Sequence, residues 1–332
     1  MKFGPLPVAQ ALDAVLAHSL ALPEGRMRKG HRLEAADLAR LEAAGLDKVI
    51  AARLEPGDVD EDTAAARLAA ALVPDPEAVG LRLGAPGTGR VNIHATGPGV
   101  LEVLAARIDA LNAVDPMISV ATVPQWQRCA TRTMVATVKI IAYAVPGAAL
   151  ERACAEARGA LRLHAPQRRR VALIRTRVAG AASEAEGPEA VRRRLERMGA
   201  VLISDTEVAH ETDALARALA EVPGAELALI LTGSATSDPH DVAPEALRRA
   251  GGQVTRFGMP VDPGNLLFFG DLGALPVIGL PGCARSPALN GADWVLERML
   301  CAVPVTEGDV AAMGVGGLLK EIPTRPQPRE GR

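Results

Sequence analysis

The second half of the sequence alternates regularly between short apolar runs and segments with helical periodicity. Strands are expected at 171–176, 201–204 and 227–231, and two further apolar runs follow at 266–269 and 276–280. Helices are expected at 188–198, 211–220, 243–250 and about 287–300. Strands that are apolar along their whole length are covered on both faces, and strands that alternate with helices form parallel sheets. This half therefore predicts an α/β fold with a three-layer, mainly parallel sheet.

The first half has a mixed pattern and predicts an N-terminal mixed α+β domain. Apolar residues at helical spacing predict helices at 7–20, 35–44, 60–72, 105–113 and from 147 to about 164. Short β-like runs lie between them at 49–51, 90–95, 100–103 and 134–142.

A chain of 332 residues fits two domains, and the basic run Arg168 to Arg170 marks the expected boundary. We expect domains at 1–165 and 168–305, followed by a C-terminal extension at 306–332. From Pro323 onward this extension has the proline-rich, charged composition of a flexible segment. The basic run is interpreted as the solvent-exposed start of a strand and not as a binding patch, because an isolated cluster of charges has little binding specificity.

Composition argues against nucleic acid and membrane as partners. Lys plus Arg (37) nearly balances Asp plus Glu (39), and aromatic residues make up only 2% of the chain, which leaves few rings for base stacking. No apolar run reaches the length that spans a bilayer, and the N-terminus lacks the pattern of an export signal. The four cysteines lie far apart without metal-ligand spacing, which indicates reduced thiols. A cytoplasmic location is therefore expected.

Two turns rich in small and polar residues follow predicted strands. One covers 232–241 and the other covers 281–286. In an open α/β sheet, ligands bind beyond the carboxyl ends of the strands, where turns present backbone amides. Hydroxyl groups, helix-start N–H groups and the cation of Arg285 suit a phosphate. In the alternative interpretation, Thr232, Ser234, Ser286 and the glycines only form tight turns and helix caps.

Three segments of this half resemble a known family. Residues 232–241, 262–265 and 280–286 are similar, in that order, to three signatures of the molybdopterin-binding domain of molybdenum insertases and the gephyrin E domain, which are roughly TGGxSxGxxD, KPGKP and LPGNPxS. The likeness extends over about 171–304. A weaker likeness at 7–62 is to the early region of insertase-like proteins, and to a subgroup in which such a region precedes a nucleotidyltransferase domain.

The resemblance implies a ligand, a set of binding residues and partners. The ligand would be molybdopterin or its nucleotide conjugate, a pterin phosphate, held by Thr232, Gly233, Ser234, Ser237, Pro263, Gly264, Pro281, Gly282, Arg285 and Ser286. Asp241 occupies the position of the signature aspartate near the nucleotide phosphate and Mg²⁺, so it is the candidate catalytic residue and metal ligand. An N-cap of the following helix is an equal alternative for Asp241. Further implied partners are molybdate, molybdoenzymes or a cofactor nucleotidyltransferase, and a second copy in a homodimer.

Several signature positions differ from the family pattern. Ser234 and Asp238 replace glycines, Asp262 and Asn265 replace lysines, and Cys283 replaces an asparagine. The loss of two cations and the gain of Asp262 weaken anion binding by ~1 kcal/mol or more per charge in a partly buried site. We therefore expect a molybdopterin-binding protein of molybdenum cofactor biosynthesis, either an insertase-like molybdotransferase or a cofactor carrier, with binding ranked before turnover. The alternative is a non-catalytic sensor or scaffold that keeps the fold.

Three further residues are assigned structural roles. His210 and Glu211 are expected to form a helix start at the surface, because no acid/base partner is visible in the sequence. Cys283 is expected to be a small buried residue in preference to a reactive thiol at a helix start. The parallel topology also predicts that the turns 232–241 and 281–286 come together in one pocket.

Overall fold

The computed structural model describes residues 1–180 and 186–319. The chain divides into two compact units, one formed by Met1–Gly97 and Leu101–Leu163, the other by Pro98–Val100 and the chain from His164 onward. Among the described helices, none has the length and apolar character needed to cross a membrane.

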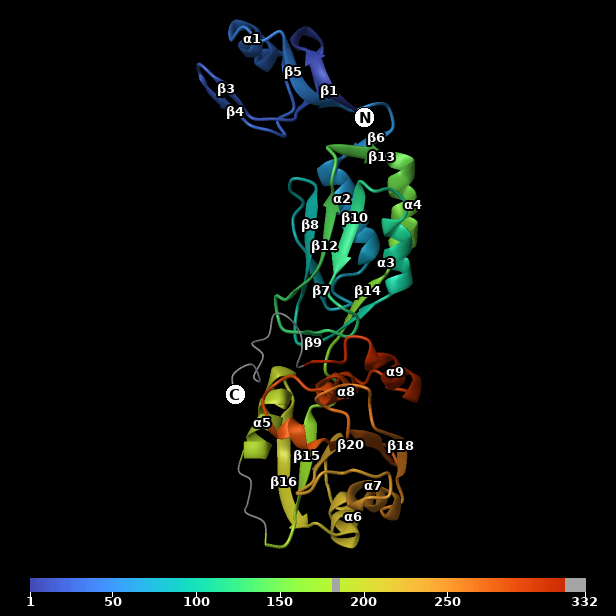
Figure 1. The fold of residues 1–332 in the computed structure, drawn as a ribbon. Helices are drawn as coiled ribbons and strands as arrows, with labels where there is room; N and C mark the ends of the chain where they lie inside the picture. Colours follow the sequence, from blue (N-terminus) through green and yellow to red (C-terminus); the bar gives the residue numbers. More distant parts are fainter. Residues whose placement is uncertain (181–185, 320–332) are drawn as a thin grey trace. The chain divides into compact units, whose positions relative to one another are not determined.

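Residues 1–53 of the first unit form a small module with its own core, which includes Leu16, Leu33, Leu41 and Val49. Its elements are β1 (Lys2–Pro7), η1 (Val8–Gln10), β2 (Val15–Leu16), β3 (Leu20–Leu22), β4 (Gly25–Met27), α1 (Ala35–Ala43) and β5 (Lys48–Arg53). Strands β1, β5 and β2 form an antiparallel sheet, and β3 and β4 form a hairpin (Figure 1).

The prediction of a helix at 7–20 is wrong. Only Val8–Gln10 forms a helical turn, Asp13 has a positive φ of 63° that no α-helix accommodates, and Val15 pairs with Ala52 of β5. The apolar spacing that predicted a helix instead reflects buried positions of an irregular segment. The helix expected at 35–44 and the strand at 49–51 are confirmed.

The rest of the first unit is built around a four-stranded antiparallel sheet with the order β10-β12-β8-β7. Its elements are β6 (Asp58–Asp60), α2 (Glu61–Leu72), β7 (Leu81–Leu83), β8 (Arg90–Ala95), β9 (Gly99–Val103), α3 (Ala105–Asn112), β10 (Ile118–Thr122), β11 (Arg128–Cys129), β12 (Met134–Ile140), β13 (Ala144–Pro146), α4 (Gly147–Ala157) and β14 (Leu161–His164). The helix expected to reach His164 ends at Ala157, because Gly159 has a positive φ of 66° and the chain continues as β14.

The second unit contains a six-stranded, mainly parallel sheet, as the alternating pattern predicted. The strand order is β16-β15-β17-β20-β19-β18. Its elements are β15 (Arg170–Arg177), α5 (Glu186–Arg197), β16 (Val201–Ala209), α6 (Thr212–Ala220), β17 (Leu227–Leu231), α7 (Val242–Arg249), β18 (Gln253–Phe257), β19 (Phe268–Leu272), β20 (Leu275–Leu280), η2 (Gly282–Arg285), α8 (Gly291–Leu300), α9 (Glu307–Ala311) and η3 (Ala312–Gly314). Strand β19 runs antiparallel to both β18 and β20, because a tight hairpin at Gly273 joins it to β20.

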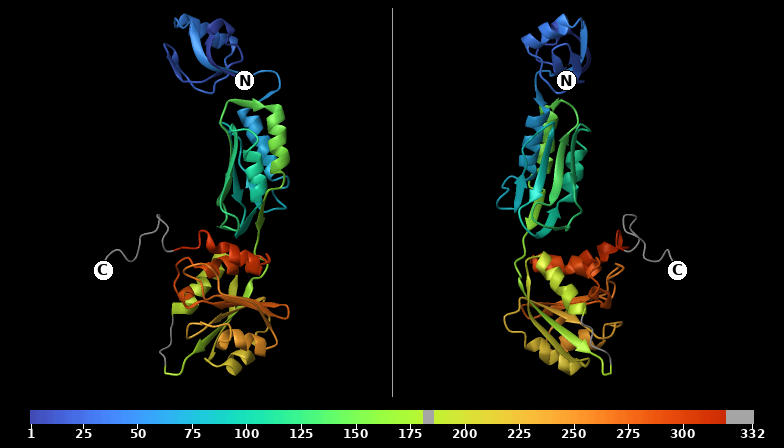
Figure 2. Two further views of the ribbon diagram at one scale, coloured as in Figure 1. Left: turned by 45° about the vertical axis from the view of Figure 1, so that its right-hand side comes forward. Right: turned by 90° about the vertical axis from the view of Figure 1, so that its left-hand side faces the viewer.

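The apolar strands of this sheet are buried along their length. Leu215, Leu219 and Leu247 of α6 and α7 pack against Ile174, Ile230 and other residues of one face. Leu173, Leu229 and Ile278, which have the opposite side-chain direction, are also fully buried. Helix α5 contacts β16, and α8 contacts β20 (Figure 2). Helix α8, which was expected to be the last helix and to begin at about 287, begins at Gly291, because the preceding residues form η2 and an extended stretch. The shorter helices α9 and η3 follow it.

Candidate functional site

The candidate site lies at the carboxyl edge of the parallel strands in the second unit. The chain passes from β15 to β16 on one side and returns to β17 on the other, so the ends of β15 and β17 form the topological switch point of the sheet. The loops after β17 and β20 lie at this edge, since these two strands are parallel neighbours. The loop between β18 and β19 also lies there, because Phe268 at its end pairs with Gly279.

Gly233, in the first signature segment, packs directly against the end of β15. Its amide donates a hydrogen bond to Thr176 Oγ1 at 3.0 Å. A Cβ at this position would lie 2.6 Å from the carbonyl oxygen of Thr176 and 3.2 Å from the amide nitrogen of Val178. Only glycine permits this close approach.

The buried hydroxyl of Thr232 organises the first loop from within. It donates a hydrogen bond to the Ser234 carbonyl oxygen at 2.6 Å and lies 3.2 Å from Thr236 Oγ1. Thr232 is only 4% exposed, whereas Ser234 and Ser237 are exposed. Of the predicted hydroxyl groups in this loop, the two serines are therefore the ones open to a ligand.

Thr176 and His210 belong to this candidate site, although no sequence pattern identified them as ligand contacts. His210 Nδ1 lies 2.7 Å from Thr176 Oγ1, the same hydroxyl oxygen that accepts the Gly233 amide. A neutral His210 that accepts the hydroxyl proton at Nδ1 carries its own proton at Nε2. The expectation that His210 only forms a surface helix start is therefore incomplete, whereas Glu211 is exposed and precedes α6 without a side-chain capping bond.

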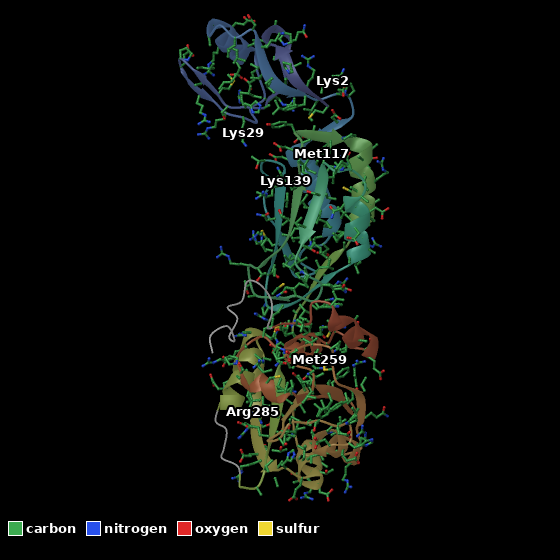
Figure 3. The ribbon with its side chains drawn as sticks, viewed as in Figure 1. Lys2, Lys29, Met117, Lys139, Met259 and Arg285 are labelled. Carbon is green, nitrogen blue, oxygen red and sulfur yellow. The ribbon has the colours of Figure 1, made fainter. Side chains whose placement is uncertain are left out.

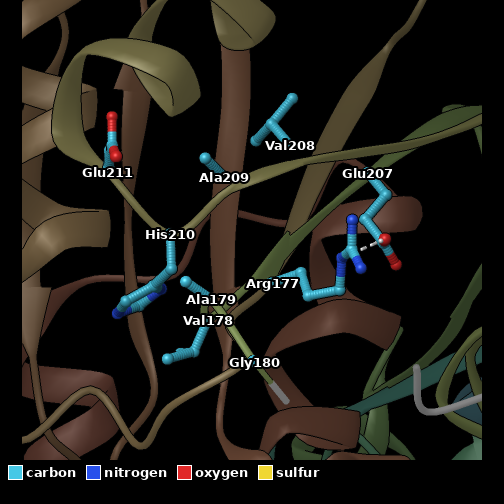
Figure 4. A pocket seen from close by; sticks show the side chains of 9 residues that line it. All are labelled: Arg177, Val178, Ala179, Gly180, Glu207, Val208, Ala209, His210 and Glu211. Atoms are coloured by element: carbon cyan, nitrogen blue, oxygen red, sulfur yellow. Dashed lines mark ion pairs between the residues drawn. The ribbon is translucent and has the colours of Figure 1, made fainter. Parts of the chain in front are cut away.

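A cavity of about 510 Å³ opens at the ends of β15 and β16 (Figure 4). Its lining consists of Arg177, Val178, Ala179, Gly180, Glu207, Val208, Ala209, His210 and Glu211. Arg177 Nε pairs with Glu207 Oε1 at 3.0 Å, so these two charges in the lining of the cavity neutralise each other. The volume falls within the range of small-molecule sites, and the mixture of apolar and hydrogen-bonding groups is typical of them.

Asp241 forms the helix cap that was one of its two predicted roles. Its Oδ1 accepts the Val242 amide at 2.7 Å and its Oδ2 accepts the Ser237 amide at 3.1 Å. Within residues 1–180 and 186–319, no group of three or more His, Cys, Asp or Glu side chains is placed to hold a metal ion. Each carboxylate oxygen retains acceptor capacity, so Asp241 fits only the role of a single ligand to Mg²⁺ beside a phosphate.

The main chain of the second signature segment is hydrogen-bonded on one side to Gly291, at the start of α8, and on the other to Gly317. The Pro263 carbonyl oxygen accepts the Gly291 amide at 2.8 Å. Gly264 has a positive φ of 139°, and a Cβ there would lie 2.7 Å from the Gly291 amide nitrogen. The Asp262 amide donates to the Gly317 carbonyl oxygen at 2.8 Å, so main-chain groups of both Asp262 and Pro263 are already paired.

The third signature segment meets the first through Arg285. Arg285 is labelled in Figure 3. Its Nη2 donates to the Thr232 carbonyl oxygen at 2.5 Å, and its Nη1 donates to the Gly282 carbonyl oxygen at 3.4 Å. The structure thus brings the two turns into contact, as the parallel topology predicted. The residues that line the cavity of about 510 Å³ come from neither turn, so a pocket shared by the two turns stays a prediction. Pro281 is buried beneath them, and Ser286 Oγ, which is exposed, accepts the Ala288 amide at 3.3 Å.

Cys283 departs from expectation, because it is exposed and not buried. It lies on η2, where Ala284 is the residue that turns inward. Its Sγ lies 3.0 Å from Asn290 Nδ2, so the side chain lies beside the residue that caps α8.

Comparisons with known proteins give one family model and several solved structures. Residues 5–53 match the model of a domain family of unknown function, DUF8806. No curated protein sequence matches the chain. A molybdopterin biosynthesis MoeA protein from Pyrococcus horikoshii is similar at 13% identity over 91% of this chain and 75% of its own, with a TM-score of 0.32. A molybdopterin biosynthesis enzyme MoaB from Thermus thermophilus is similar at 19% identity over 46% of this chain and 99% of its own, with a TM-score of 0.28. A molybdopterin biosynthesis protein from Mycobacterium abscessus is similar at 17% identity over 40% of this chain and 92% of its own, with a TM-score of 0.29.

Proposed function

We propose that the carboxyl edge of this sheet binds molybdopterin or its nucleotide conjugate through the phosphate. The chain would then act in molybdenum cofactor biosynthesis as an insertase-like molybdotransferase or as a cofactor carrier. The observation that carries the proposal is the hydrogen bond from Arg285 to the Thr232 carbonyl oxygen. It joins the first and third signature segments at the switch point of an open α/β sheet, where such folds bind their ligands.

The chemistry of the edge suits a pterin phosphate. The hydroxyls of Ser234, Ser237 and Ser286 are exposed donors for phosphate oxygens, and Arg285 supplies a cation beside them. The neighbouring cavity of about 510 Å³ offers the exposed carboxylate of Glu211 as an acceptor for the amino and ring N–H groups of a pterin, whereas Glu207 is already paired with Arg175 and Arg177. When a magnesium ion is bound to the ligand phosphate, it would supply positive charge there, and Asp241 is the residue that would hold it.

One observation favours a sensor or scaffold that keeps the fold without the chemistry. The guanidinium of Arg285 is engaged by two main-chain carbonyl oxygens, and that of Arg177 is paired with Glu207. Asp262 and Asn265 stand where the family signature has lysines. A site with fewer uncommitted cations stabilises less of the negative charge that develops in a transition state, which favours a fold that has lost turnover.

Native mass spectrometry of the chain purified from a host that makes the cofactor tests the proposal. We expect a co-purifying pterin phosphate in the wild type. Arg285→Ala should weaken its affinity ten- to a hundredfold, on the ~1.5–3 kcal/mol scale of a charge-assisted hydrogen bond. Arg249→Ala is the matched control, because Arg249 is exposed on α7 and pairs only with Asp213 among the described residues. Absence of any pterin, together with no binding in titration, would overturn the proposal.

A further inference from the structure

Arg194 occupies a position on α5 that the helical pattern reserves for apolar residues. Gly187, Ala190, Val191, Leu195 and Met198 form the buried stripe of this segment, and Arg194 lies among them with only 7% of its surface exposed. A charged side chain at such a position is stable only when its donors are satisfied. Its neighbours Arg192 and Arg193 point outward and are exposed.

The guanidinium of Arg194 uses all five of its N–H donors. Nε donates to Asp293 Oδ1 at 2.5 Å, and Nη1 donates to the carbonyl oxygens of Ala190 and Ala284 at 3.2 and 2.9 Å. Nη2 donates to the carbonyl oxygens of Ser286 and Ala288 at 2.8 and 3.0 Å. Three of these five acceptors are main-chain carbonyls of the loop between β20 and α8.

These contacts determine how the loop presents its peptide groups. In a trans peptide unit the carbonyl and the following N–H point in opposite directions, so a bond from Arg194 to the Ala284 oxygen turns the Arg285 amide away from α5. Asp293 extends the network, because its Oδ2 accepts the Asn290 amide at 2.9 Å while Asn290 Oδ1 accepts the Ala292 amide at 3.0 Å. The same hydrogen-bond network therefore fixes both the loop between β20 and α8 and the first turn of α8.

We propose that Arg194 is the positioning residue of the site. It holds the loop 282–290 in the conformation from which Arg285 reaches Thr232 and Ser286 faces the ligand phosphate. Lysine cannot replace it, since an ammonium group has three donors around one point and lacks the planar fork that spans several carbonyls. The role in ligand binding rests on the proposed function, whereas the anchoring of the loop does not.

Arg194→Lys tests the proposal, with Arg193→Lys as control. Arg193 lies on the same helix, is exposed and pairs with Glu189 at 3.0 Å. We expect amide hydrogen exchange across 282–290 to become at least tenfold faster in Arg194→Lys and to stay unchanged in Arg193→Lys. We also expect the folded Arg194→Lys protein to bind hydroxymethylpterin phosphate at least tenfold more weakly than the wild type. If Arg194→Lys does not fold, the double variant Arg194→Met with Asp293→Asn replaces it, because it leaves no buried charge unpaired and keeps a capping side chain.

The two measurements separate the possible failures. A loss of thermal stability with unchanged exchange in the loop and unchanged affinity of the folded protein would show a purely structural role and overturn the proposal. If the wild type binds no hydroxymethylpterin phosphate, the proposed function fails, and faster exchange confined to 282–290 still establishes Arg194 as the anchor of the loop. Unchanged exchange in that case removes the anchor as well.

Discussion

The hydroxyl of Thr176 at the end of β15 accepts a hydrogen bond from the amide of Gly233 at 3.0 Å. The two residues are 57 positions apart in the chain, and the contact closes the first signature loop onto the neighbouring strand. The loop therefore has its shape because two parallel strands end side by side.

Gly233→Ala should destabilise the second unit. The added Cβ would lie 2.6 Å from the Thr176 carbonyl oxygen, a contact that the main chain can relieve only by moving. We expect a loss of about 1–3 kcal/mol, the usual cost of overpacking. Urea unfolding followed by circular dichroism measures it. Gly308→Ala is the control, because a Cβ there meets only Thr306 Oγ1 at 3.7 Å, and equal stability of the two variants would contradict the prediction.

The thiols should differ widely in reactivity. Cys283 is exposed, whereas Cys129 and Cys301 are buried. Burial raises the pKa of Cys301 to about 12, so at pH 8 only about one thiol in ten thousand would be ionised. Iodoacetamide should label Cys283 first in the native protein and reach Cys301 only after unfolding. Peptide mass spectrometry over a time course reads the order, and labelling of Cys301 at the rate of Cys283 would show that the burial is wrong.

The parallel part of the sheet could be predicted because each strand is marked by the pattern of its own few residues. Strand β17 was expected at 227–231 and occupies Leu227–Leu231, since an unbroken apolar run beside a turn leaves few alternatives. The first and third signature segments are also local, so their place after strands could be predicted, while the binding role of all three segments stays a prediction. Strand β18 was missed because Gln253–Phe257 is a half-buried edge strand with a weak pattern.

The contacts that shape the site could not be predicted, because they join distant residues. Arg194 reaches Ser286 across 92 positions, and Thr176 reaches His210 across 34. One signal for Arg194 was present, namely a charge on the apolar stripe of a helix, but its acceptors are main-chain oxygens that carry no sequence signature. The helix expected at 7–20 failed for the opposite reason, since apolar spacing alone does not show that Asp13 adopts a positive φ.

Asp37 should make the N-terminal module sensitive to acid. Burial alone raises the pKa of its carboxyl, but hydrogen bonds from the Glu34 amide at 3.0 Å and from His31 at 2.6 Å outweigh burial and hold the pKa below its ordinary value of 3.8. A depressed pKa stabilises the folded state above the unfolded pKa, and this contribution is lost as the pH falls below about 4 through the folded pKa.

Asp37→Asn should therefore lower the opening free energy of α1 by about 1 kcal/mol at pH 7, and the difference from the wild type should shrink below pH 4. Amide hydrogen exchange over α1, corrected for the intrinsic rate at each pH, gives this free energy. Glu42→Gln on the same helix is the control, because Glu42 is exposed. A difference that stays constant down to pH 2 would contradict the assignment.

The two predicted roles of Asp241 can be separated by two substitutions. As the N-cap of α7 it accepts the Val242 amide, and Asn caps helices as well as Asp does, so Asp241→Asn should keep the stability within a few tenths of a kcal/mol while Asp241→Ala loses about 1 kcal/mol. As a magnesium ligand it needs its charge, so Asp241→Asn should lose the magnesium-dependent part of pterin phosphate binding and keep the rest. Thermal unfolding of both variants gives the first effect, and titration with and without Mg²⁺ gives the second. If Asp241→Ala is as stable as the wild type, the cap contributes nothing. If Mg²⁺ strengthens binding equally in the wild type and in Asp241→Asn, the ion is held elsewhere and the carboxylate serves the helix alone.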